Sequence, residues 1–309
     1  MKKVAIVILN YNGTRDTTEC LESIGKLILE EIKLLTIVVD NGSTDSLQAI
    51  SNFKFQISNF QFKLIKNEKN LGFAGGNNVG IKYVLREGSD YILILNNDTV
   101  VDKNLIKELL ETAESDSKTG IVVPKIYFAK GHEYHRNRYK ENELGKIIWY
   151  AGGIMDWKNI IGSHRGVDQV DTGQYDQVME TEFATGCAMF VKKEIFEKVG
   201  LFDEKYFLYY EDADLSERVK NAGYKIIYAP AAIIWHKNAG SAGGSGSRLQ
   251  DYYTTRNRLL FGMEYASLRA KIALIKESLK LLFLGRYWQK KGVADFYLKR
   301  FQKGSFNFN

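Results

Sequence analysis

The chain has 309 residues, 45% of them hydrophobic and 26% charged, a composition that excludes a disordered or fibrous protein and supplies a large core. Its net charge of +6 is uneven, because residues 248–309 hold 13 Lys/Arg against 4 Asp/Glu while the first 247 residues are slightly acidic. No apolar run approaches the roughly 20 residues of a membrane span, and the run after Met1 is too short for a signal peptide.

Apolar runs alternate with helical patterns over the first 110 residues. Strands are predicted at 4–9, 34–39 and 91–95, with another ending at Ile65, and helices at 14–29, after residue 72, and from Asp102 as N-cap. This β-α-β order predicts a mostly parallel sheet. An imperfect repeat at 51–56 and 58–63 indicates a strand-like insertion. The glycine-rich stretch 70–80 fits either an ordinary loop or an anion-binding loop before a helix.

The second half is less regular. We predict strands at 121–123, closed by Pro124, at 185–191 and at 226–234, broken by Pro230, with helices at 193–199 and 215–222. Residues 129–180 are polar and aromatic, and we expect acceptor-side loops there. Apolar residues recur at helical spacing after Leu268 among basic ones, which fits a helix packed on the fold or one lying on a membrane surface.

Three polar clusters follow apolar elements. Asp98 comes directly after the strand at 92–95, where a carboxylate either ligates a divalent metal or caps a turn. Glu211, Asp212 and Asp214 begin a helix, either as favourable first-turn acids or with one of them as a desolvated base. His236 ends a strand before a glycine-serine stretch, which suits a ligand beside a movable loop.

These blocks together resemble the inverting family 2 glycosyltransferases with the GT-A fold. The similarity is greatest to a bacterial branch that includes rhamnosyltransferases of polysaccharide and cell-wall assembly. The matching blocks follow the family's order at residues 10–13, 39–45, 70–77, 95–98, 185–186, 211–215 and 235–236.

The resemblance implies a role for each block. Asp40 would bind the pyrimidine of the nucleotide, in a site shared with Leu9, Asn10, Tyr11, Gly72, Asn77 and Asn97. Asp98 and His236 would hold Mg²⁺ or Mn²⁺, although Asn96 replaces the first acid of the family's Asp-x-Asp motif. Asp212 would be the catalytic base with Glu211 beside it. The acceptor and donor sugars would lie near Gly186, Asp214 and Trp235.

The function implied is metal-dependent, inverting transfer of a hexosyl or rhamnosyl group from dTDP-rhamnose or a UDP-sugar to a hydroxyl of a glycan or lipid-linked acceptor. Residues 1–247 would form the GT-A catalytic domain. Residues 248–309 would form a basic, amphipathic helical region in peripheral contact with a membrane. The alternative is a non-catalytic sugar-nucleotide-binding subunit, because Asn96 weakens the acidic pair, but an intact Glu211-Asp212 argues against it.

We expect a cytoplasmic protein that can lie on the inner face of the cell membrane. Nothing resembles a motif for nucleic acids, so we expect no nucleic-acid partner and favour anionic lipid for the basic C-terminal region. Cys20 and Cys187 lie far apart without metal-like spacing, which predicts reduced core thiols.

Overall fold

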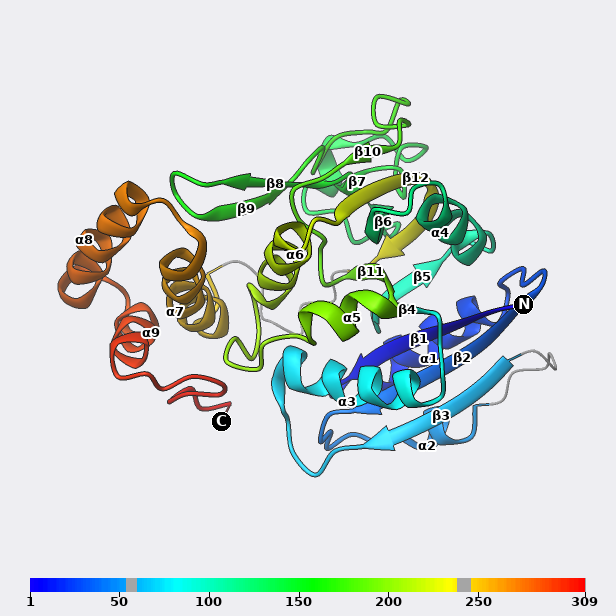
Figure 1. Ribbon diagram of the computed structural model, residues 1–309, viewed down its shortest axis with the longest axis horizontal. Helices are drawn as coiled ribbons and strands as arrows, with labels where there is room; N and C mark the ends of the chain where they lie inside the picture. Colours follow the sequence, from blue (N-terminus) through cyan, green and yellow to red (C-terminus); the bar gives the residue numbers. More distant parts are fainter. Residues whose placement is uncertain (54–59, 238–245, 309) are drawn as a thin grey trace.

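The structure, a computed structural model, describes residues 1–53, 60–237 and 246–308. Within these residues one mixed sheet of ten strands forms the centre of the molecule (Figure 1). Its strand order is β10-β12-β6-β11-β4-β1-β2-β3, with β5 beside β12 and β7 beside β6. The bounds are β1 Lys2–Asn10, β2 Ile32–Asp40, β3 Phe60–Lys66, β4 Tyr91–Asn96, β5 Thr99–Val101, β6 Thr119–Phe128, β7 Ile148–Tyr150, β10 Met179–Glu180, β11 Ala188–Lys192 and β12 Lys225–His236.

Strands β3, β2, β1 and β4 run parallel, as the β-α-β order predicted. β11 runs antiparallel to both β4 and β6, and β12 is parallel to β6. Residues 4–8 of β1 and 92–95 of β4 are at most 1% exposed, because helices cover both faces of the sheet. The predicted mostly parallel α/β architecture with C-terminal helices is confirmed.

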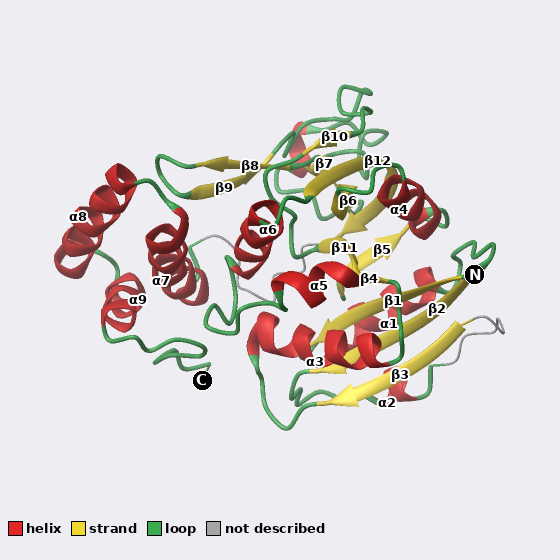
Figure 2. Ribbon diagram, viewed as in Figure 1, coloured by secondary structure: helices red, strands yellow, loops and turns green. Residues whose placement is uncertain are grey.

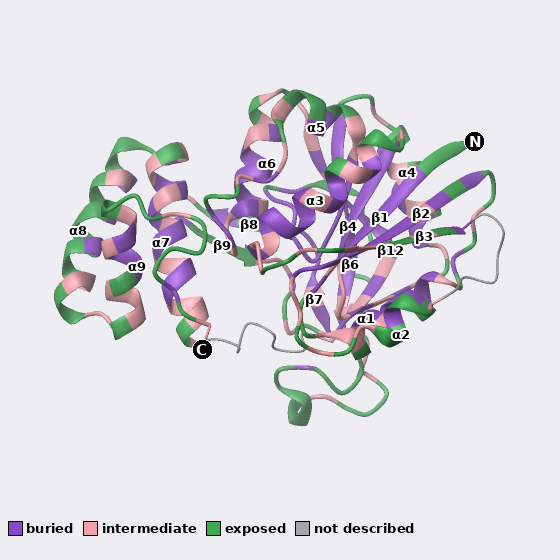
Figure 3. Ribbon diagram, turned by 90° about the horizontal axis from the view of Figure 1, so that it is seen from below, coloured by how far each residue is buried: buried purple, intermediate pink, exposed green. Residues whose placement is uncertain are grey.

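Helices α3 (Gly72–Arg86) and α5 (Lys193–Val199) lie on one face of the sheet, and α1 (Thr14–Ile24) and α2 (Gln48–Ser51) lie on the other (Figures 1 and 3). α4 (Leu105–Glu114) packs on β6 and β12, and α6 (Glu211–Asn221) on β12. A separate hairpin of β8 (Gly153–Asp156) and β9 (Ile161–His164) projects beyond α6 toward the C-terminal helices.

Several predicted boundaries were wrong. α1 ends at Ile24 rather than Leu29, because Gly25 caps it and residues 26–27 continue in tight turns. Asn104, not Asp102, is the N-cap of α4, while the Asp102 carboxylate accepts the Asn104 N–H. β6 continues through Pro124 to Phe128, because the proline, which lacks an N–H, lies where β12 bulges after Ala229.

Two further regions differ from the sequence prediction. The segment 129–180 is not irregular throughout, since it contains β7 to β10 and a 3₁₀ turn at Arg136–Arg138. In the imperfect repeat, the first copy begins in α2 and runs into residues 54–59, which lie outside the described residues, while the second copy leads into β3. Most of the predicted movable stretch after His236, residues 238–245, also lies outside the described residues.

The glycine-rich stretch belongs to α3 itself rather than to a loop before it. A Cβ on Gly76 would clash with Leu9, and one on Gly80 would lie 2.5 Å from Val7 Cγ1. These glycines therefore let α3 approach β1 closely. Neither explanation left open for this stretch, an ordinary loop or an anion-binding loop, accounts for Gly76 and Gly80, which let the helix pack on the sheet.

The C-terminal helices α7 (Arg248–Tyr265), α8 (Leu268–Leu284) and α9 (Tyr287–Tyr297) pack together beside α6 and the hairpin (Figure 2). α8 buries Ala270, Leu274 and Ser278, whereas the apolar stripe noted in the sequence is largely exposed on its other face. In the part of the chain that the structure describes, none of the helices combines the length and apolarity needed to cross a bilayer.

Candidate active site

Three neighbouring strands end together at one edge of the sheet. Asn10 of β1 is opposite Asp40 of β2, and Leu9 is opposite Asn96 of β4. Asp40 is 3% exposed, and its carboxylate accepts Asn10 Nδ2 at 2.9 Å and the Ser43 N–H at 3.4 Å. Open α/β sheets bind ligands at this edge. The predicted nucleotide residues of β1 and β2 are therefore brought together.

A chain of side chains connects this pair to the loop after β4. Thr17 Oγ1 donates to Asn10 Oδ1 at 2.8 Å, and Asn97 Nδ2 donates to Thr17 Oγ1 at 3.0 Å. A Cβ on Gly13 would lie 2.6 Å from Asn97 Nδ2, so a side chain there would displace the Asn97 amide. Asn97 thus orients the two loops relative to each other.

The other predicted nucleotide residues occupy different environments. Tyr11 is 36% exposed at the sheet edge, whereas the Leu9 side chain packs under α3. Gly72 has a φ of +76°, and a Cβ there would clash with the carbonyl oxygen of Phe207. Asn77 is fully buried on α3, with its Nδ2 bonded to Phe73 O and its Oδ1 without a partner among the described residues. Gly72 therefore contacts the loop before α6.

Asn41 is a structural residue that the sequence reasoning missed. Its amide donates to Asn70 Oδ1 and Gly72 O, and its carbonyl accepts Asn67 Nδ2 and the Leu71 N–H. It thereby fixes the segment that leads into α3 against the end of β2. Its place directly after Asp40 in a polar run was the signal that could have revealed it.

Asp98 and His236 meet although 138 residues separate them in sequence. β12 pairs with β5, which brings His236 Nε2 to 3.1 Å from Asp98 Oδ1. The imidazole is 4% exposed and packs edge-on against Trp149. Burial disfavours the charged imidazole, but the neighbouring Asp98 carboxylate favours it, and the pKa of His236 is raised well above 6.5.

Once a cation displaces the proton from the imidazole, this pair has the spacing to hold one divalent cation. Adjacent ligands at about 2.1 Å from an octahedral ion lie about 3 Å apart, which matches the separation of Nε2 and Oδ1. Among the described residues, no third His, Cys, Asp or Glu completes a metal cluster. A cation here would thus need further ligands from a substrate, as bound Mg²⁺ takes them from phosphates.

Asp212 contacts the turn at Gly186-Cys187. Its Oδ2 accepts the Gly186 N–H at 2.9 Å, and its Oδ1 accepts the Ala213 N–H at 2.8 Å. Burial raises the pKa of Asp212 above 3.8 despite these hydrogen bonds. A Cβ on Gly186 would lie 3.1 Å from Phe73 Cζ, a tight contact, and 3.5 Å from Asp212 Oδ2, an ordinary one, so the glycine mainly leaves room for the Phe73 ring.

Glu211 has a different environment from its neighbour. It is 4% exposed, and its Oε2 has no hydrogen-bond partner among the described residues. Burial, reinforced by the Asp212 charge, raises the pKa of Glu211 well above 4.5. Of the two carboxyl groups, Asp212 is thus the one whose ionised form is hydrogen-bonded and suited to accept a proton.

The segment 205–210, which we name the base loop, leads into α6 in a strained conformation. Phe207, Tyr209 and Tyr210 have φ angles of 65°, 68° and 72°. Each such left-handed residue that is not glycine costs about 1–2 kcal/mol. The position of Asp212 therefore depends on contacts that hold this loop.

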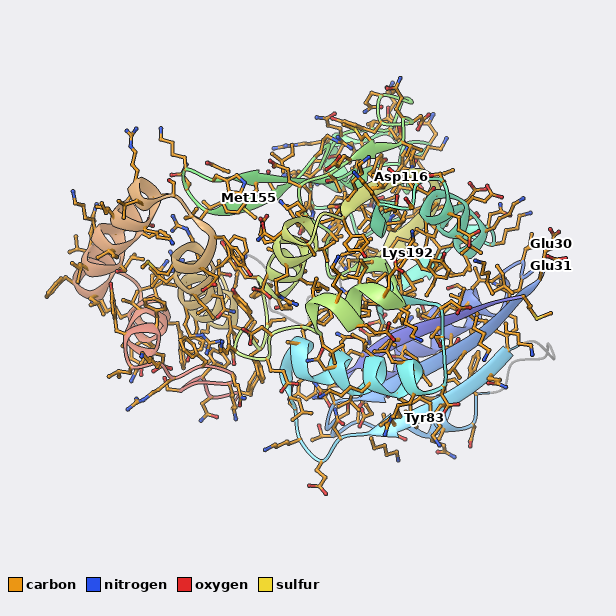
Figure 4. The ribbon with its side chains drawn as sticks, in the orientation of Figure 1. Glu30, Glu31, Tyr83, Asp116, Met155 and Lys192 are labelled. Carbon is orange, nitrogen blue, oxygen red and sulfur yellow. The ribbon has the colours of Figure 1, made fainter. Side chains whose placement is uncertain are left out.

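A cavity of about 480 Å³ opens beside Asp212. It lies between the β8–β9 hairpin, α6 and the C-terminal helices, and Figure 4 places one of its lining residues, Met155, on the hairpin. Much of its lining is apolar, from Met155, Ile161, Phe183, Leu259, Leu274 and Leu281. A substrate in this cavity would bring a hydroxyl to Asp212 while its apolar part contacted the helices.

Asp214 and Trp235 lie in places that do not suit sugar binding. Asp214 is buried, and its carboxylate accepts Arg218 Nη2 at 2.7 Å and the Tyr265 hydroxyl at 2.8 Å. Trp235 neighbours His236 on β12, so its side chain points to the opposite face, where Nε1 donates to Gly145 O. We leave both residues out of the proposed site.

Cys20 and Cys187 are free and buried, as predicted. Burial raises the pKa of Cys20 to about 12, and it raises that of Cys187 as well. The thiols therefore stay protonated and unreactive.

Comparison with known proteins matches residues 5–200 to Glycosyl transferase family 2. A "low-salt glycan biosynthesis hexosyltransferase Agl10" of Haloferax volcanii is 25% identical over 83% of this chain and 74% of its own length. An "N-acetylglucosaminyl-diphospho-decaprenol L-rhamnosyltransferase" of Mycobacterium tuberculosis is 26% identical over 67% of each chain.

Solved structures show the same fold. GalNAc-T7 with UDP, GalNAc and Mn²⁺ superimposes with a TM-score of 0.62 at 16% identity, over 92% of this chain and 58% of that one. A mannosyltransferase of Pyrobaculum calidifontis with GDP-Man and Mn²⁺ gives 0.52 at 14% identity, over 96% and 86%. The chain therefore belongs to glycosyltransferase family 2, the nucleotide-sugar glycosyltransferases with a GT-A fold.

Proposed function

We propose that this protein is a metal-dependent, inverting glycosyltransferase that moves a hexosyl or rhamnosyl group from a UDP- or dTDP-sugar to a hydroxyl of a glycan or lipid-linked acceptor. The observation that carries the proposal is the Asp212 carboxylate, held by two backbone N–H groups at the wall of a cavity large enough for an acceptor. A sugar-binding subunit without catalysis would not need a desolvated carboxylate there.

The donor side supports a nucleoside diphosphate. Asn10 and Asp40 offer a buried amide–carboxylate pair for a pyrimidine, and Asp98 with His236 would hold a divalent cation against the diphosphate. Bound Mg²⁺ or Mn²⁺ supplies charge neutralisation for the departing diphosphate. Two solved relatives of the same fold contain a nucleotide and Mn²⁺, which supports this use of the pair.

The reaction follows from one base on the acceptor side. The acceptor hydroxyl gives its proton to Asp212 as its oxygen forms a bond to the anomeric carbon. The bond from that carbon to the diphosphate oxygen breaks on the opposite face, and the nucleoside diphosphate leaves with the electron pair. A single displacement inverts the anomeric carbon, in contrast to double displacement through a covalent intermediate.

The C-terminal region supports a lipid-linked acceptor at a membrane. α8 exposes an apolar stripe whose members include Leu268 at 75%, Leu279 at 49% and Phe283 at 77% exposure, while Arg269, Lys276 and Lys280 are exposed on the same helix. Each basic residue at an anionic surface contributes about 1 kcal/mol. The Mycobacterium tuberculosis relative carries a decaprenol acceptor in its name, which agrees with this proposal.

Vesicle binding tests the membrane part. The full chain should co-sediment with vesicles containing phosphatidylglycerol at low salt and be released at high salt. Leu279→Asp with Phe283→Asp should abolish binding, whereas Val178→Asp, at a residue 60% exposed outside α8, should not. Full-length protein that stays in the supernatant at low salt would refute the membrane contact.

Turnover tests the catalytic part. Purified protein would be incubated with UDP-glucose, UDP-N-acetylglucosamine or dTDP-rhamnose and a polyprenyl-diphosphate-linked sugar, with Mn²⁺ or with EDTA. We expect transfer only with metal, and a product whose anomeric configuration, read by NMR, is opposite to that of the donor. Retention of configuration would overturn the single displacement. Binding of a donor without transfer or hydrolysis would favour the non-catalytic subunit.

A further inference from the structure

The base loop is held by two neighbouring side chains of α7, 46 or more residues away in the sequence. Asn257 is fully buried, and its Nδ2 lies 2.8 Å from each of three carbonyl oxygens, those of Tyr206, Leu208 and Tyr209. The two amide hydrogens therefore donate to one turn. The three carbonyl groups of this turn point toward Asn257 because Phe207, Tyr209 and Tyr210 are left-handed. The Asn257 Oδ1 accepts Arg256 Nε at 2.9 Å, which fixes the orientation of the amide.

Arg256 is also fully buried and connects the base loop to the end of the chain. Its Nη2 donates to Tyr206 O at 2.9 Å and Lys205 O at 3.2 Å, and its Nη1 donates to Gln302 O at 2.7 Å. The guanidinium also lies 5.4 Å and 5.0 Å from the ring centres of Tyr252 and Tyr253. The fork geometry of arginine lets one side chain bind both segments.

The C-terminal segment completes this support. The Gln302 N–H donates to Lys205 O at 2.9 Å, and Phe306 and Phe308 pack in one aromatic cluster with Phe207 and Tyr253. A Cβ on Gly304 would clash with the Tyr252 hydroxyl and lie 2.9 Å from Arg256 Nη1. Residues 300–308 therefore fold back onto the same side chains that hold the base loop.

We propose that Arg256 and Asn257 are positioning residues for catalysis, which hold the left-handed base loop in the conformation that presents Asp212 to the acceptor. The proposal rests on the proposed role of Asp212. Without these donors, carbonyls of the turn lose buried partners, and a strained turn relaxes toward conformations in which its peptides face water. The displacement would reach Asp212, since Tyr210 directly precedes α6.

Asn257→Asp is the sharpest test, because it keeps the size of the side chain and the acceptor for Arg256 Nε but removes the N–H donors. We expect kcat to fall roughly 10- to 100-fold, as displacements of about 1 Å do, with the donor KM and the Mn²⁺-dependent binding of UDP or dTDP nearly unchanged. The acid limb of the kcat profile should also move to lower pH, because a more hydrated Asp212 loses the effect of burial on its pKa.

Tyr228→Phe is the control. Tyr228 is fully buried on β12, and the change removes one hydrogen bond, from its hydroxyl to Tyr175 O, but no contact with the base loop or with the side chains that hold it. It should lower Tm by a few degrees, through the loss of one hydrogen bond, and leave kcat and its pH profile as in the wild type.

The outcomes separate this role from simple stabilisation of the fold. If Asn257→Asp lowers Tm but leaves kcat and the acid limb unchanged, the positioning role is wrong. Should it fail to fold, Arg256→Lys, which keeps the charge but not the fork, carries the same test and the same two readouts. Full activity of Asp212→Asn would instead overturn the proposed function, whatever the α7 variants do.

Discussion

The donor side and the base side of this site are built in different ways. Asn10, Asp40 and Asp98 stand at or just after the ends of buried parallel strands, so the sheet itself sets their spacing. Asp212 instead follows a loop with three left-handed aromatic residues, held by side chains of α7. Changes on the donor side should therefore act through the binding of nucleotide and metal, whereas on the base side even changes far from Asp212 can alter turnover.

The comparison also shows how strain is distributed. Residues 4–8 of β1 are buried and extended, and the donor-side turns use left-handed backbone at Asn12 and Gly42, residue types that tolerate it. The base side stores left-handed conformations that persist only because the surrounding contacts require them. Such a loop places a carboxylate at a cavity wall, where burial raises its pKa.

The largest effect is expected for Asp212→Asn, which removes the base and leaves the donor side intact. Transfer should fall roughly 10²- to 10⁴-fold, while metal-dependent binding of UDP or dTDP stays near wild type. Initial-rate kinetics with saturating donor and acceptor provide the measurement. Activity within a few-fold of wild type would remove Asp212 from the mechanism.

A smaller effect, measured in nucleotide binding, is expected on the donor side. Asp98→Ala or His236→Ala should weaken Mn²⁺-dependent binding of a nucleoside diphosphate by at least about 10-fold, because each removes one of two protein ligands. Titration calorimetry with and without Mn²⁺ would measure it. If metal makes no difference to binding by the wild type, Asn96 has removed the metal site and the assignment is wrong.

The pH profile of the wild type should reflect burial of the base. Asp212 must be ionised to accept a proton, and burial raises its pKa above 3.8, so kcat should fall with decreasing pH earlier than for an exposed aspartate. The profile should be recorded at saturating Mn²⁺ and donor. A kcat that stays constant from roughly pH 7 to pH 4 would contradict the buried base.

The smallest effect on activity is expected for Glu211→Gln. The pKa of Glu211 is raised well above 4.5, so the folded protein keeps this group neutral and glutamine replaces it closely. The unfolded chain releases that proton at lower pH, so the wild type loses stability as pH rises from the ordinary glutamate value through the folded pKa. The Tm of Glu211→Gln minus the Tm of the wild type should therefore be larger at pH 8 than at pH 5. An equal difference at both values would show that Glu211 titrates normally.

Sequence periodicity revealed the donor side because its residues follow apolar strands, and motif order pointed to Asp98, His236 and Asp212. The pairing of β12 with β5, which brings His236 to Asp98, is non-local and could only be inferred from the resemblance. The sequence could not show that Asp214 binds Arg218 of its own helix, because a first-turn acid can bind its own helix as readily as a substrate. The hydrogen bonds from Arg256 and Asn257 to the base loop could not be predicted from the sequence. Their acceptors are backbone carbonyls, which every residue has, so the pattern of side chains does not indicate them.

The separate roles of the donor side and the base side can be tested directly by titration calorimetry. UDP and dTDP would be titrated into wild type, Asp98→Ala and Asp212→Asn, each with and without Mn²⁺. We predict that Mn²⁺ strengthens binding in the wild type and in Asp212→Asn by the same factor, and that Asp98→Ala loses this enhancement. Loss of the enhancement in Asp212→Asn, or its survival in Asp98→Ala, would contradict the assignment of metal and base to opposite sides of the site.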